Sequence, residues 1–375
     1  MIYVDYASTT PTSSEVLKSY TQVLERFYAN SESLHTLGVE VYQVMEKSRQ
    51  QTASLLRVKP NEVIFTSGAS EANSMAIKGI CFQYQNKGKH IITSKIEHSS
   101  VINAFKQLEE VFGFEVTYLD VNENGVVDVE QLKNSLRNDT ILCSIMYVNN
   151  EVGSIQPIAE IKKLIRKYTN CFLHVDCVQA LGKLPIDLQD IDLATFSAHK
   201  VFGLKGSGIL VKKQHVQLLP LINGGQQEMG IRGGTANACT HIMFAKTLRL
   251  ALEQQAKHYT YVKGLNTFLR DELAKIDGVV INSPFDGSPF ILSFSCLNLP
   301  SEVHMNALND KGIYVSAQST CGSKSHSYSY VLQAMGIKNE RLHGVIRLSL
   351  SHLNTMEEMQ TIVKIVKENV EKYGI

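Results

Sequence analysis

The chain has 375 residues, of which 44% are hydrophobic and 19% are charged. This balance is typical of a globular protein and excludes disordered and collagen-like chains. Lys and Arg together number 37 and Asp and Glu 36, so the net charge is +1. Without an excess of basic residues, we expect no direct binding to nucleic acid.

Seven cysteines are spread along the chain, and no two of them have C-x-x-C spacing. An odd number without paired spacing argues against a disulfide framework and against a zinc cluster, so we expect no metal. The first residues lack the basic start and the apolar core of a secretory signal. No stretch approaches the ~20 apolar residues of a membrane span. These features predict a cytoplasmic protein with reduced thiols and no membrane contact.

Helical and strand patterns alternate through the first two thirds of the chain. Strands are expected at 62–66, 90–93, 114–119, 141–148, 172–175, 193–196 and 208–211, and helices at 48–56, 71–81, 101–110 and 158–168. The last strand returns so soon after its predecessor that we expect it to be antiparallel. The alternation predicts an α/β fold with a mostly parallel mixed sheet wrapped by helices.

The pattern changes near residue 255. We expect one long helix at 236–263, then strands near 279–281, 290–294 and 345–350 with helices between them. We interpret this part as a smaller α+β domain. The predicted division is a large domain of residues 15–257 and a small domain of residues 1–14 and 258–375, with the first dozen residues packed against the small one.

Residues 65–71, Phe-Thr-Ser-Gly-Ala-Ser-Glu, have the composition of a strand end, a small-residue turn and a helix start. Unpaired backbone N–H groups and the helix dipole make such a point attractive to anions. Gly68 and Ala69 leave room for a phosphate, and Ser70 adds a hydroxyl donor. An ordinary capped turn is the alternative interpretation.

Two charged residues follow apolar strands downstream of this turn. Asp176 ends one strand, where ligands of parallel sheets bind, and its carboxylate can neutralise a cationic ring nitrogen; a helix N-cap is the alternative. Lys200 follows the next strand, beside His199 and a glycine-rich run. A desolvated lysine becomes an amine that forms a Schiff base with an aldehyde, whereas a surface lysine is the default. With the phosphate turn, these are the parts of a pyridoxal phosphate site.

The chain resembles the NifS/IscS-type cysteine desulfurases of the class V aminotransferase group, which are fold-type I pyridoxal phosphate enzymes. The resemblance runs from residue 3 to about residue 363. It is carried by YVDYASTTP at 3–11, TSGASE at 66–71, EH at 97–98, VNNEVG at 148–153, HVD at 174–176, GKLPID at 182–187, SAHK at 197–200, RGGT at 232–235 and IRLSL at 346–350.

The resemblance implies a role for each matching residue. Lys200 would bind pyridoxal phosphate covalently, Asp176 would pair with its ring nitrogen, and His98 would stack on the ring and move protons. Arg347 would bind the substrate carboxylate through two parallel hydrogen bonds. The other implied contacts are Ala69, Ser70, Ser197 and His199 at the phosphate, Asn150 and Gln179 at the ring hydroxyl, and Thr235 at the phosphate of the partner subunit in a homodimer. Capping, turn and structural ion-pair roles are the alternatives for His98, Thr235, Asn150 and Arg347.

Cys321 lies in a small, polar segment at 315–330, a composition that indicates an exposed thiol. Nearby cations can hold such a thiol as the thiolate. The resemblance implies that Cys321 takes the sulfur of L-cysteine as a persulfide, leaves L-alanine and passes the sulfur to an acceptor protein. Gln318 departs from the glycine frequent in the family and disfavours a positive φ there.

The predicted function is therefore that of a cysteine desulfurase, with Cys321, Lys200 and His98 as its catalytic residues. The chain ends without the C-terminal extension of IscS-like members, so iron–sulfur cluster assembly and the thiolation of tRNA or cofactors both stay open as destinations of the sulfur. Another class V enzyme, such as a selenocysteine lyase or an aminotransferase, and a non-catalytic cofactor-binding scaffold are the alternatives.

Overall fold

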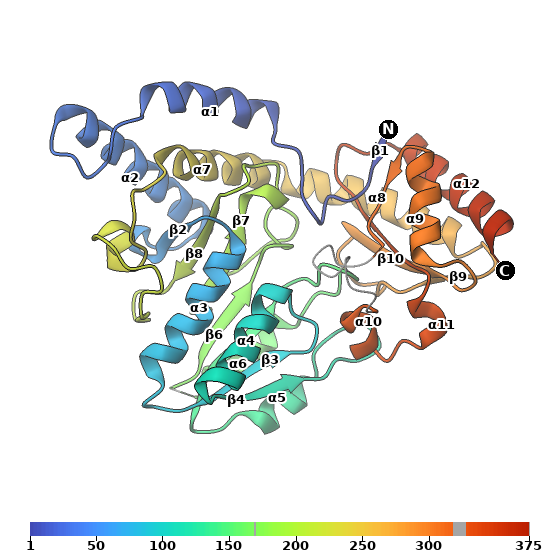
Figure 1. The fold of residues 1–375 in the computed structure, drawn as a ribbon, viewed down its shortest axis with the longest axis horizontal. Coiled ribbons are helices and arrows are strands. Elements are labelled where there is room, and N and C mark those ends of the chain that lie inside the picture. The colour runs from blue at the N-terminus through green and yellow to red at the C-terminus, as the bar shows by residue number, and fades with distance from the viewer. Residues whose placement is uncertain (169, 318–327, 375) are drawn as a thin grey trace.

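The computed structural model describes residues 1–168, 170–317 and 328–374. A seven-stranded sheet forms the centre of the larger part (Figure 1), in the order β2-β8-β7-β6-β5-β3-β4. Its strands are β2 Val63–Thr66, β3 His90–Ser94, β4 Glu115–Leu119, β5 Thr140–Met146, β6 Phe172–Asp176, β7 Leu193–Ser197 and β8 Gly208–Lys212. Strands β4, β3, β5, β6 and β7 pair in parallel, and β8 is antiparallel to both of its neighbours. The predicted mixed sheet, with an antiparallel strand at 208–211, is confirmed.

Helices cover both faces of this sheet. Successive side chains of a strand point to opposite faces, and in these strands the side chains on both faces are mostly apolar and need to be buried. Ile91 and Leu142 pack into one apolar cluster with α3 and α4, while Ile92 and Cys143 pack into another that includes residues of α6 and α7. The α-helices are α1 Ser14–Arg26, α2 Thr36–Leu56, α3 Ala69–Tyr84, α4 Ser99–Phe112, α5 Val129–Ser135, α6 Ile158–Ile165 and α7 Ala238–Glu253. Short 3₁₀ helices are η1 Pro60–Glu62, η2 Ala198–Lys200 and η3 Gln227–Gly230.

A second, smaller group of elements lies beside the large sheet and contains both termini (Figure 1). Its strands are β9 Val279–Ile281, β10 Ile291–Cys296 and β12 Val345–Ser349, which form an antiparallel sheet, and β1 Ile2–Tyr3 with β11 Ile313–Tyr314, which pair in parallel. Its helices are α8 Gln255–Leu273, α9 Ser301–Asp310, α10 Tyr330–Ala334, α11 Asn339–Leu342 and α12 Met356–Tyr373. The first residues do pack here, since Ile2 pairs with Ile313. The domain boundary at residue 257 stays a prediction.

The prediction of one helix at 236–263 is wrong. The chain breaks at Gln254 (φ −107°, ψ 0°), which ends α7 and precedes α8. Helix α7 packs on α1 and α2, whereas α8 packs on α12 and on strands β9 and β10. Each helix buries its apolar side against a different core, and the break at Gln254 changes the direction of the chain between the two cores. A hydrophobic pattern read along one straight helix does not reveal this change of direction.

Candidate active site

One cavity of about 590 Å³ lies at the carboxyl edge of the large sheet. Its wall includes Met146, Asp176 and Ser197, the last residues of β5, β6 and β7. The carboxyl ends of neighbouring parallel strands meet at one edge of a sheet, so residues distant in sequence converge there. Predicted site residues in this wall are Ala69, Ser70, His98, Asn150, Asp176, Gln179, Ser197, His199, Lys200 and Arg347.

The turn before α3 forms the anion-binding end of the cavity. Gly68 has φ 152°, a backbone conformation that favours glycine, and α3 begins at the next residue. The first turn of this 16-residue helix supplies N–H groups without intrahelical partners beside the cavity. The Ser197 hydroxyl is buried and has no hydrogen-bond partner among the described residues. A phosphate oxygen would satisfy it, so these groups fit a phosphate.

His199 lies beside this end of the cavity and is neutral at pH 7. Burial, with the charges of Lys200 and Lys205, lowers the pKa of His199 to about 4. Its Nδ1 atom lies 3.1 Å from Oγ1 of Thr9, which comes from the N-terminal segment. A neutral ring in this place offers a hydrogen bond to a phosphate but no charge.

Asp176 presents a fixed carboxylate further along the cavity. It is 6% exposed, and its Oδ1 accepts the Val178 N–H at 3.0 Å. Its Oδ2 accepts Nδ2 of Asn73, on α3, at 2.9 Å. Oδ1 of Asn150, also in the cavity wall, is buried without a partner among the described residues. An aromatic ring with a cationic nitrogen and a hydroxyl group fits these polar atoms.

His98 is the N-cap of α4 and lies in the cavity wall. Its Nδ1 accepts the Ser100 N–H at 3.2 Å and lies 2.8 Å from the Ser100 hydroxyl. The preceding residue, Glu97, is fully buried, and burial raises its pKa to about 8 despite hydrogen bonds from Ser94 and Met146. Glu97 is therefore protonated at pH 7, which keeps a second negative charge away from Asp176.

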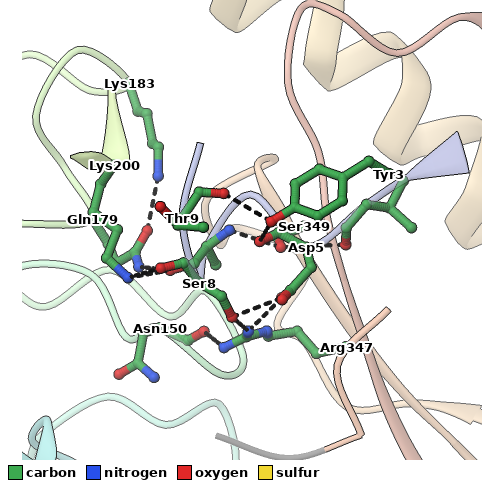
Figure 2. Close-up of polar contacts among 12 residues, drawn as sticks. Tyr3, Asp5, Ser8, Thr9, Asn150, Gln179, Lys183, Lys200, Arg347 and Ser349 are labelled. Carbon is green, nitrogen blue, oxygen red and sulfur yellow. Dashed lines mark hydrogen bonds and ion pairs between the residues drawn. The ribbon is translucent and has the colours of Figure 1, made fainter. Parts of the chain in front are cut away.

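The N-terminal segment lies across Lys200 (Figure 2). The Lys200 amine donates to the carbonyl oxygens of Ala7, at 2.7 Å, and Ser8, at 2.6 Å. Gln179 donates to the same Ala7 carbonyl at 3.0 Å, and its Oε1 accepts Nζ of Lys183 at 2.8 Å. Burial, with the charges of Lys200 and Arg347, lowers the pKa of Lys183 to about 7. A second buried amine thus lies one hydrogen bond behind the cavity wall.

Arg347 comes from β12 and brings the small sheet to the cavity. Its side chain is 4% exposed and pairs with Asp5 at 2.8 Å, while the same nitrogen donates to the Ser8 hydroxyl at 2.7 Å (Figure 2). The other terminal nitrogen donates to the Asn150 carbonyl at 2.9 Å. Its Nε is buried without a partner among the described residues. The guanidinium is thus fixed by acceptors from two segments, the N-terminal residues Asp5 and Ser8 and the Asn150 carbonyl, while its Nε–H has no acceptor among the described residues.

Comparison with known proteins places this geometry in a family. The family "Aminotransferase class-V" matches residues 2–362. The chain belongs to this family. Cysteine desulfurase IscS of Dictyoglomus turgidum is 38% identical over 375 residues, covering 99% of this chain and 95% of the relative. A NifS/IcsS protein homolog of Lactobacillus delbrueckii is 41% identical, covering 97% and 95%.

Solved structures agree with this placement. A NifS-like protein superposes with a TM-score of 0.93 at 36% identity, covering 99% of both chains. A NifS-like protein from Rickettsia africae does so with a TM-score of 0.88 at 29% identity, again covering 99% of both chains. The predicted membership of the NifS/IscS-type class V enzymes and the predicted fold class are confirmed.

Of the predicted site residues that the structure describes, Thr235 does not line the cavity. Thr235 lines a separate cavity of about 170 Å³ together with Gln227 and Arg232. The segment around it is fixed to α2 by a buried ion pair between Arg49 and Glu228, at 2.8 Å. Cys321 lies outside the described residues, so its place stays a prediction. Among the described residues, no group of three or more His, Cys, Asp or Glu side chains is arranged to hold a metal ion.

The sequence analysis missed several residues of the site. Asn73, Asp5 and Tyr330 were given no role, yet Asn73 bonds Asp176, Asp5 pairs with Arg347, and the Tyr330 hydroxyl donates to the Glu97 carbonyl at 2.5 Å. One signal was available for Asn73. It follows Ala69 by four positions, which places both on the same face of α3.

Proposed function

We propose that this protein is a pyridoxal phosphate-dependent cysteine desulfurase that converts L-cysteine to L-alanine. The observation that carries the proposal is the convergence of Lys200, Asp176 and Arg347 on one cavity. The family relatives named cysteine desulfurase support the choice of reaction. The Cys321 thiolate would attack the substrate sulfur. The carbon–sulfur bond would break, its electron pair and a proton would stay on carbon as alanine, and Cys321 would carry the persulfide.

The donor set fits pyridoxal phosphate. Ala69, Ser70, Ser197 and His199 would hold its phosphate, Asp176 its ring nitrogen, and Asn150 and Gln179 its hydroxyl side. Once bound, the cofactor supplies an electron sink for the substrate carbon next to the carboxylate. The chain's own part is to hold an amine, Lys200, against that carbon and to remove or return its proton. His98 would lie against the ring face.

Arg347 would bind the substrate carboxylate. In the described structure its terminal nitrogens donate to Asp5, Ser8 and the Asn150 carbonyl, and its Nε has no partner among the described residues. A carboxylate that takes this donor adds a charge-assisted bond without disturbing the existing ones. The contacts of Arg347 with Asp5, Ser8 and Asn150 would then set the position of the substrate relative to Lys200.

A homodimer is part of the proposal, because α1 and the segment that joins it to α2 expose large apolar side chains. The side chains of Leu24, Tyr28 and Leu34 are 51%, 74% and 96% exposed. Several large apolar side chains exposed in one stretch of chain are typical of a protein interface. Thr235 would then reach the cofactor phosphate of the partner subunit, consistent with its absence from the wall of this chain's own cavity. The chain has a mass of 41.8 kDa, and light scattering should give twice this mass.

The sulfur acceptor would be a protein that serves iron–sulfur assembly or thiolation, and the enzyme would work in the cytoplasm. Among the described residues no helix combines the length and the apolar character needed to cross a membrane. The near-zero net charge favours a protein acceptor over direct contact with nucleic acid.

The test uses purified protein and L-cysteine, with alanine and sulfide measured with and without dithiothreitol. A visible absorption band that Lys200→Ala abolishes, together with equal amounts of alanine and sulfur, would support the proposal. Cys321→Ala should abolish sulfide release, whereas Cys171→Ala, in a core cysteine of the large part, should keep it. A cofactor band without alanine would point to another class V reaction, and no band after addition of pyridoxal phosphate would refute the proposal.

A further inference from the structure

Asn73 connects Asp176 to His98, two residues of the cavity wall, through the side chain of Ser100. Its side chain, on α3, is fully buried. One amide nitrogen, Nδ2, donates to Oδ2 of Asp176 at 2.9 Å and to Oγ of Ser100 at 2.9 Å. Its Oδ1 is buried without a partner among the described residues. Leaving a buried carbonyl oxygen unpaired costs free energy. The orientation of the amide is therefore set by the two bonds that Nδ2 donates and not by a partner for Oδ1.

The bond directions in this chain follow from its two ends, the Asp176 carboxylate and the backbone N–H of Ser100. A carboxylate accepts, so Nδ2 of Asn73 must donate, and the second hydrogen of Nδ2 goes to Oγ of Ser100. The Ser100 hydroxyl oxygen accepts this bond, lies 2.8 Å from Nδ1 of His98 and can direct its own hydrogen there. The backbone N–H of Ser100 donates to the same Nδ1 at 3.2 Å. Two donors therefore face one ring nitrogen.

We propose that Asn73 and Ser100 are positioning residues that join Asp176 to His98 and, whenever the His98 ring is neutral, keep its proton on Nε2. A neutral imidazole carries one proton, and a nitrogen that faces two donors cannot hold it. His98 then offers an N–H donor through Nε2 and must lose that proton before it can accept another there. The proposal rests on the cofactor site proposed above, but it concerns atoms of this chain alone.

The test reads the ring nitrogens directly, with and without pyridoxal phosphate. Protein labelled with ¹⁵N-histidine is examined by long-range ¹H–¹⁵N correlation, and His98→Asn identifies the signals. Wild-type protein should show Nδ1 unprotonated and Nε2 protonated. Ser100→Ala should raise the minor tautomer about five- to tenfold, the effect of one lost hydrogen bond. Ser100→Thr, which keeps the hydroxyl, should restore the wild-type pattern.

Asn73→Leu should act in the same direction as Ser100→Ala, because the hydroxyl of Ser100 is then free to turn. Ser74→Ala, a matched change at the next position of α3, should leave the His98 signals unchanged. A proton on Nδ1 in the wild-type protein would overturn the proposal, as would an unchanged tautomer in both Ser100→Ala and Asn73→Leu. Absence of alanine production would refute the proposed function without affecting this result.

Discussion

Glu97→Gln should change the pH dependence of stability, because Glu97 is a buried carboxyl that folding keeps protonated. Burial raises its pKa from 4.5 to about 8. Its Oε1 accepts from the Ser94 hydroxyl at 2.5 Å and from the Met146 N–H at 3.0 Å, and its Oε2 has no partner among the described residues. Glutamine keeps both accepted bonds and resembles the protonated acid in shape. The substitution therefore removes a titration and little else.

The magnitude follows from the two pKa values. Between pH 4.5 and 8 the folded chain holds a proton on Glu97 that the unfolded chain has lost, so wild-type stability falls as pH rises through this window. The slope approaches about 1.4 kcal/mol per pH unit. From pH 6 to pH 8 the wild type should lose about 2 kcal/mol through this group, and Glu97→Gln should lose none of it.

Urea unfolding at pH 6, 7 and 8, at one fixed cofactor concentration, measures this difference. The free energy of unfolding of Glu97→Gln minus that of the wild type should rise by about 2 kcal/mol over the range. Glu302→Gln, which changes an exposed carboxyl on α9, should show a constant difference. A constant difference for Glu97→Gln as well would refute the reasoning, because it would mean that Glu97 is ionised in the folded protein.

Two further substitutions test the proposed substrate contact of Arg347 and the lowered pKa of the buried Lys183. Arg347→Lys should raise KM for L-cysteine about 10- to 100-fold, since lysine lacks both the Nε–H donor proposed for the substrate carboxylate and the planar group that Asp5, Ser8 and Asn150 hold in place; steady-state kinetics beside the surface control Arg249→Lys checks this. Lys183→Met should stabilise the protein more at pH 7 than at pH 9, because the folded chain holds Lys183 at a pKa of about 7 and the cost of burying its charge fades as pH rises toward 10.5. Urea unfolding at the two pH values measures it, and an equal effect at both would contradict a lowered pKa.

Much of the large sheet could be predicted because its strands, apart from the edge strand β4, are buried on both faces and bounded by turns. The β5 region reads as an unbroken apolar run, and all seven residues of the strand are buried. The helix break at Gln254 could not be predicted, because it depends on which core each half of the helix packs against. Strand β1 is two residues long and pairs with residues 313–314, a contact without a local signal.

The cavity shows the same division between local and long-range information. The turn at Gly68, the carboxylate at Asp176 and the amine at Lys200 each follow a strand, so the order of strands predicts that they meet. Nothing local predicts that the first ten residues cover Lys200, or that Asp5 pairs with Arg347 across 342 positions. Arg347 on β12 and the N-terminal segment both belong to the smaller group of elements, so the contacts with Lys200 join that group to the large sheet. We therefore expect the large sheet to assemble the cofactor-binding groups first, and docking of the small group to complete the substrate site.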